Sequence, residues 1–151
     1  MDFDLITMFQ SDDSAIEKVK SEILDTNSKS AEYGLTLSEQ DAEMILRADI
    51  NALSEQDRIN FGRSIAPRMI EKFMQSSYIA PSEYAETIAE LINIFYEVKE
   101  ESYDILTDDE IIDVMYSFFE KESGGSLEVL QNRDMDLLCR KIRNMANGIT
   151  E

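Results

Sequence analysis

The chain has 151 residues, of which 43% are hydrophobic and 30% are charged, and its net charge is −18 at pH 7. This length and apolar content suffice for one sizeable core, so we expect a single folded domain over residues 1–151 rather than a disordered chain. Because like charges repel, the charge argues against nucleic acid and anionic membrane surfaces as partners and leaves basic proteins.

The residue types that the chain lacks exclude several kinds of active site. It has no histidine, which removes Ser-His-Asp and Cys-His catalysis and the common zinc and di-iron sites. It also has no glycine-rich phosphate-binding loop, and we expect no cofactor. The single cysteine, Cys139, cannot form an internal disulfide, and the amino terminus lacks a secretory signal pattern, so we expect a cytoplasmic location.

Helical periodicity begins after residues 1–11, a mixed apolar and acidic segment whose structure the sequence leaves open. Apolar residues three and four apart then predict an amphipathic helix over residues 13–27. The run Thr36-Leu37-Ser38-Glu39 has the form of a capping box and predicts the start of the next helix, which reaches Leu53. A further helix is expected over residues 63–76.

One carboxylate interrupts the apolar face of the second of these helices. Asp49 lies in the middle of that face, and a buried carboxylate needs a partner or loses its charge. We therefore expect Asp49 to be a buried polar residue, bound by an arginine from residues 58–68 or by free amides at a helix start.

Two strongly apolar helices are expected at the centre of the fold, over about residues 82–100 and 108–120. The second is apolar over more than half of its circumference, which is typical of a central helix. Ser82 is expected to cap the first helix, and Thr107 and Glu110 are expected to form a capping box at the second. The short connection between the helices predicts antiparallel neighbours.

The carboxyl-terminal part begins with Gly124-Gly125-Ser126, which predicts a break followed by a short helical turn. The last helix is expected over residues 133–147. The predicted fold is therefore all-α, an irregular bundle of five to seven helices packed around the central antiparallel pair.

Several short runs are familiar when they are considered together: Arg58-Ile59-Asn60-Phe61-Gly62, Ser77-Tyr78-Ile79, Phe95-Tyr96-Glu97-Val98-Lys99, Asp108-Asp109-Glu110-Ile111-Ile112 and Gly125-Ser126-Leu127-Glu128. With these runs the chain resembles a family of small bacterial proteins of unknown function, from about Gly34 to Arg143. The resemblance implies an all-helical bacterial cytoplasmic protein. It brings no activity, cofactor or catalytic residue.

Two pairs of carboxylates support the one enzymatic interpretation: Glu97 with Glu100, and Glu110 with Asp113. Carboxylate pairs on adjacent helices can hold Mg²⁺ for nucleotide pyrophosphate hydrolysis, and this pattern resembles the ExxE and ExxD motifs of all-helical nucleotide pyrophosphohydrolases. The spacing between the pairs is shorter than in that family, however, and the first pair points away from the apolar stripe of its helix. We favour a solvated acidic surface and expect no metal site.

The favoured function is a non-enzymatic interaction or regulatory protein. Its candidate binding residues are Asp104, Asp108 and Asp109, at the acidic corner between the two central helices. Such a corner can dock a basic surface on another protein, or the helix over residues 133–143 of a second copy of the chain. A weaker alternative is an acidic DNA mimic that occupies a nucleic-acid-binding protein.

Overall fold

The computed structural model of the protein describes residues 13–56, 64–102, 105–133 and 135–146. Every regular element in these ranges is helical, which confirms the all-α prediction. The α-helices are α2 (Asp13–Asp25), α3 (Asn27–Ser30), α4 (Glu39–Glu55), α5 (Ala66–Phe73), α6 (Tyr84–Glu101), α7 (Asp108–Lys121), α8 (Leu127–Asn132) and α9 (Met135–Ala146). Two 3₁₀ turns, η1 (Ala31–Tyr33) and η2 (Pro81–Glu83), lie in the connections.

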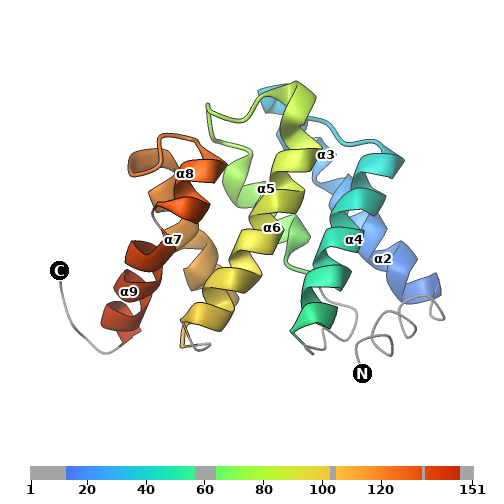
Figure 1. Cartoon of the computed structure of the whole chain (residues 1–151). Coiled ribbons are helices and arrows are strands. Elements are labelled where there is room, and N and C mark those ends of the chain that lie inside the picture. Colours follow the sequence, from blue (N-terminus) through green and yellow to red (C-terminus); the bar gives the residue numbers. More distant parts are fainter. Residues whose placement is uncertain (1–12, 57–63, 103–104, 134, 147–151) are drawn as a thin grey trace.

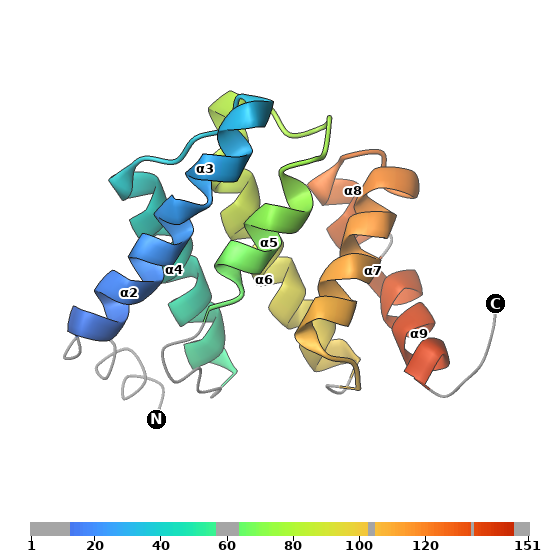
Figure 2. The same ribbon diagram turned by 180° about the vertical axis from the view of Figure 1, so that it is seen from behind.

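The longer helices form two layers. Helices α4, α6 and α9 lie side by side in one layer and run in the same direction (Figure 1). Helices α2, α5 and α7 lie in the other layer and run the opposite way (Figure 2). Across the layers α2 packs on α4, α5 on α6, and α7 on α9. Antiparallel helix pairs therefore stack side by side, as they do in helical repeat proteins.

Helix α6 is the central element of this arrangement. It contacts α4, α5, α7, α8 and α9, and Ile88, Leu91, Ile92 and Phe95 on its inner face are fully buried. Its antiparallel neighbour α7 was expected from the sequence, but the most extensive packing along α6 comes from α4. The seam between α4 and α6 is therefore the main contact between helices that are distant in the sequence.

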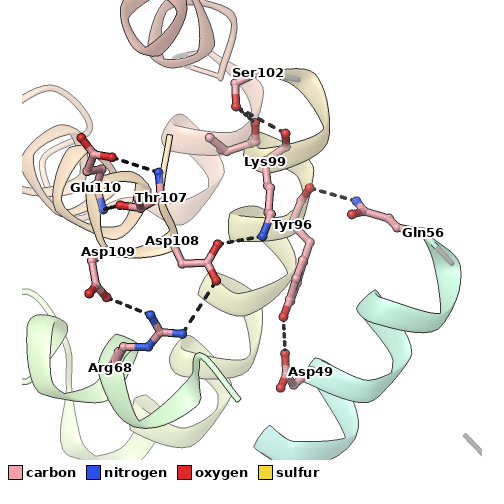
Figure 3. A network of polar contacts seen from close by, with 11 residues as sticks. Asp49, Gln56, Arg68, Tyr96, Lys99, Ser102, Thr107, Asp108, Asp109 and Glu110 are labelled. Atoms are coloured by element: carbon pink, nitrogen blue, oxygen red, sulfur yellow. Dashed lines mark hydrogen bonds and ion pairs between the residues drawn. The ribbon is translucent and has the colours of Figure 1, made fainter. Parts of the chain in front are cut away.

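Two of the predicted helix starts are confirmed. Thr107 accepts a hydrogen bond from the amide of Glu110, whose side chain accepts one from the amide of Thr107, so the capping box at α7 is complete (Figure 3). Ser126 caps α8 by accepting a hydrogen bond from the amide of Val129. These side chains satisfy amides that the first turn of a helix leaves free.

Two other predicted helix starts are wrong. At α4 the capping box is formed by Ser38 and Asp41, two residues after the predicted pair Thr36 and Glu39. At α6 no side chain caps the helix, because residues 81–83, which include the predicted cap Ser82, form the turn η2.

The shift at α4 has a specific cause. Asn27 binds both main-chain groups of Leu37, donating to its carbonyl at 3.0 Å and accepting from its amide at 2.8 Å. Leu35 and Leu37 are also buried, with 2% and 5% of their surface exposed. This segment is thereby held outside the helix, and α4 starts at the next residue that can cap it.

The hydrophobic core is one continuous cluster that includes residues from both layers. Its largest fully buried aromatic side chains are Phe73, Tyr84, Phe95 and Phe119. Within the described part of the chain, none of the helices combines the length and the apolar character needed to cross a membrane.

Candidate functional site

A buried polar cluster lies in the seam between α4 and α6. Only 1% of Asp49 is exposed, and the Tyr96 hydroxyl donates a hydrogen bond of 2.7 Å to its Oδ1 (Figure 3). The Ser64 hydroxyl, just before α5, also acts on the Asp49 carboxyl group and lowers its pKa. The expected direct partners were an arginine from residues 58–68 or free amides. Arg58 and Arg63 lie outside the described residues, and the partner that the structure provides is the Tyr96 hydroxyl. In the described part of the chain, Arg68 forms its ion pairs with other acids.

Burial raises the pKa of Asp49 to about 6, because the ionised carboxylate loses its hydration. The hydrogen bond from Tyr96, the Ser64 hydroxyl and the positive charge of Arg68 lower this pKa, and the negative charge of Asp108 raises it. Desolvation is the largest of these effects, so Asp49 holds its proton more tightly than an exposed aspartate does.

Tyr96 is held to α4 at a second point. Gln56, directly after the last residue of α4, donates a hydrogen bond of 2.9 Å to the Tyr96 carbonyl (Figure 3). Tyr96 thus contacts α4 through its side chain, and its main chain binds the residue that follows α4. The sequence did not identify it as the partner of Asp49; the available signal was a hydroxyl-bearing aromatic residue inside a strongly apolar helix.

The acidic corner is partly neutralised within the chain. Asp108 lies 2.7 Å from Lys99 Nζ and 3.7 Å from Arg68 Nη2, and Asp109 lies 3.0 Å from Arg68 Nη1 (Figure 3). Asp104 lies outside the described residues. Two of the three candidate binding residues therefore already have cationic partners on α5 and α6.

The four carboxylates of the predicted magnesium site are Glu97, Glu100, Glu110 and Asp113. The structure does not bring them together. Glu97 accepts a hydrogen bond from Gln131 of α8, Glu110 takes part in the cap of α7, and Asp113 pairs with Lys72 of α5 at 3.0 Å. Among the described residues, no three carboxylate or cysteine side chains are grouped so that they could hold a metal ion.

We accordingly expect Mg²⁺, Mn²⁺ and Ca²⁺ to bind more weakly than about 10 μM, because a tight site needs several converging oxygen ligands. Isothermal titration of the full chain with each ion measures this directly. A stoichiometric site with tighter affinity would contradict the expectation. If Glu97→Gln with Asp113→Asn then abolished that site, the magnesium interpretation would be restored.

The outer face of α6 carries a second acidic feature, which we call the α6 ridge. It consists of exposed residues at spacings of three and four: Glu86, Glu90, Asn93, Glu97 and Glu100. At 1.5 Å per residue the ridge is about 21 Å long. Helix α6 itself lies in the middle of its layer, between α4 and α9 (Figure 1). Among the described residues, no lysine or arginine forms an ion pair with Glu86, Glu90 or Glu97.

Comparison with known proteins agrees with the resemblance seen in the sequence runs. Neither the curated proteins nor the solved structures gave a match to the chain. A family model described as "Family of unknown function (DUF6323)" matches residues 22–148, which include the buried Asp49 cluster and the α6 ridge. The match brings no activity and no binding residue. Since it covers most of the chain, the protein belongs to this family of unknown function.

Proposed function

We propose that the protein is a non-enzymatic interaction module whose α6 ridge binds a basic surface on another protein. The observation that carries this proposal is the row of glutamates along the exposed face of α6, which has no ion-paired cation at Glu86, Glu90 or Glu97 among the described residues. The net charge of −18 strengthens long-range attraction to a basic partner.

The ridge is a better binding surface than the acidic corner. A cation from a partner would have to compete at Asp109 with Arg68, and at Asp108 with Lys99 as well. At Glu86 and Glu90, no lysine or arginine among the described residues would have to be displaced. Complementary charge at such exposed positions mainly accelerates association and selects the partner.

The shape of the ridge indicates what kind of partner fits. Its glutamates recur at helical spacing over about 21 Å, which is the length of about four helical turns. A helix that carries lysine or arginine three and four residues apart presents charges at matching intervals. The preferred partner is therefore a protein with an exposed basic helix.

The test compares two variants that each lose three negative charges. The ridge variant carries Glu86→Gln, Glu90→Gln and Glu97→Gln. The corner variant carries Asp108→Asn and Asp109→Asn at the acidic corner, together with Asp113→Asn about one turn further along α7. A partner is first captured on the wild-type chain and identified by mass spectrometry. Its association and dissociation rates are then measured with each variant at several salt concentrations.

We expect the ridge variant to associate at least about tenfold more slowly at low salt, with a much smaller change in dissociation. The corner variant should stay within about threefold of the wild type. Binding should weaken steeply with salt, because the Debye length falls from about 30 Å at 0.01 M to about 3 Å at 1 M. Circular dichroism of both variants checks that they remain folded.

Other outcomes would overturn this assignment. If the corner variant binds more slowly than the ridge variant, the corner is the binding surface. If the binding rates change neither with salt concentration nor in either variant, an apolar surface is responsible. If the captured partner is a second copy of the chain, the ridge serves self-association. If the protein releases nucleic acid from the partner, it acts as a DNA mimic.

A further inference from the structure

Asp49 occupies an unusual place in the packing of the helices. It lies in the middle of α4, on the face that packs along α6, and its carboxylate is shielded from water. We propose that Asp49 is a proton-operated latch: the neutral carboxyl group lets α4 pack firmly against α6, and ionisation loosens that seam. This inference does not depend on the proposed binding function.

Among the described residues, the groups that face Asp49 do not neutralise its charge directly. From α6 it meets the Tyr96 hydroxyl, which is a neutral donor. From α5, the positive charge of Arg68 acts on the Asp49 carboxylate, but the Arg68 guanidinium is already shared between Asp108 and Asp109. From α7, the negative charge of Asp108 acts against ionisation. Within the part of the chain that the structure describes, an ionised Asp49 would therefore depend on the hydrogen bond from Tyr96, the Ser64 hydroxyl and one shared arginine.

The remaining neighbour of α4 is α2, and its described side chains provide no compensating charge either. On α2, Lys20 forms an ion pair at 3.2 Å with Glu43, which lies six residues before Asp49 on α4. Six residues correspond to about 9 Å along a helix. On the other side of the seam, Lys99 is paired with Asp108. Among the described residues, no lysine or arginine forms an ion pair with Asp49.

The two protonation states therefore differ in how well they suit the seam. The neutral acid still accepts the hydrogen bond from Tyr96, and its desolvation is much less costly than that of the carboxylate. Burial raises the pKa of Asp49 to about 6, whereas an aspartate in the unfolded chain titrates near 3.9. Because the folded pKa is the higher one, the stability that the proton contributes is fully present below the unfolded value and is lost as the pH rises through about 6.

The test measures the unfolding equilibrium constant by urea titration at pH values from 5 to 8, above the sequence pI of about 4.2. Asp49→Asn is the reference variant, because asparagine has the shape of the neutral acid and does not titrate. The wild-type constant, divided by that of Asp49→Asn, should rise about tenfold between pH 5 and pH 8. Glu55→Gln, which changes an exposed position at the end of α4, is the matched control. The wild-type unfolding constant divided by that of Glu55→Gln should stay the same between pH 5 and pH 8.

Two further measurements separate a latch from a purely structural role. Tyr96→Phe removes a hydrogen bond that favours the ionised carboxylate, so it should move the midpoint of the pH dependence upward. Hydrogen exchange, corrected for its intrinsic pH dependence, should show the amides of α4 opening more readily at pH 8 than at pH 5. The amides of α9, which is separated from α4 by α6 (Figure 1), should change less.

The proposal can also be tested without any variant. If Asp49→Asn fails to fold, the carboxyl carbon of Asp49 can be titrated in the wild-type chain by NMR. A midpoint near pH 6 supports the latch, and a midpoint below about 4.5, close to that of an ordinary aspartate, overturns it. A flat stability ratio between pH 5 and pH 8 would also overturn it.

Discussion

Replacing Phe73 with alanine should lower the free energy of unfolding by about 3 to 5 kcal/mol, measured by urea titration at neutral pH. The side chain is fully buried at the end of α5. Its ring meets Tyr116 and Phe119 of α7 edge-on, with centroid distances of 5.2 and 5.5 Å. Because α5 has only eight residues, few other side chains can hold it against α7.

Two variants show whether this loss reflects the packing of the ring. Phe73→Leu keeps most of the apolar volume and should cost less than half as much as the alanine variant. Tyr33→Ala removes an aromatic side chain that is 49% exposed and should change the stability by only about 0.5 kcal/mol. A loss below about 1.5 kcal/mol for Phe73→Ala would mean that α5 can repack, and that its contact with α7 is not a fixed part of the fold.

The buried faces of the helices could be predicted because they depend on local periodicity. On α6, the positions expected on the apolar stripe, such as Ile88, Leu91 and Phe95, are all fully buried. The capping box at Thr107 likewise depends on residues within one turn. Each of these features is decided within a few residues, so the sequence alone is sufficient.

The stacking of the helices could not be predicted in the same way. The short connection between α6 and α7 suggested that these two helices are the main pair, whereas α4 has the larger contact with α6. Which helices pack together depends on how their surfaces fit, and that is not visible in the period of either helix. The stacked helix pairs also share no repeated sequence, so nothing in the chain indicated their layered order.

The same limit applies to the polar groups. Only Lys99 lies near the corner acids in the sequence, yet Asp109 binds Arg68, which is 41 positions away. Burial of Asp49 followed from its place on α4, but its partner Tyr96 is 47 positions away. Local patterns reveal that a charge needs a partner. Only the packing of the helices decides which residue provides it.

Replacing Gly125 with alanine should lower the free energy of unfolding by about 2 to 5 kcal/mol, from backbone strain and a steric clash together. Gly125 has a φ of +82°, which residues with a side chain rarely adopt. A Cβ at this position would also come within 2.2 Å of Tyr78 Cγ. That atom is close to the main chain, so Tyr78 cannot avoid the clash by rotating only the end of its side chain.

Gly124 provides the matched control for this prediction. It also has a positive φ, +60°, but a Cβ there would have no neighbour within 4 Å. Gly124→Ala should therefore cost only the strain, about 1 to 2 kcal/mol. In a Tyr78→Gly background the extra cost of Gly125→Ala should fall to a similar value, because the clash is gone. Equal losses for the two alanine variants in the wild-type background would show that Tyr78 moves freely and does not fix the loop between α7 and α8.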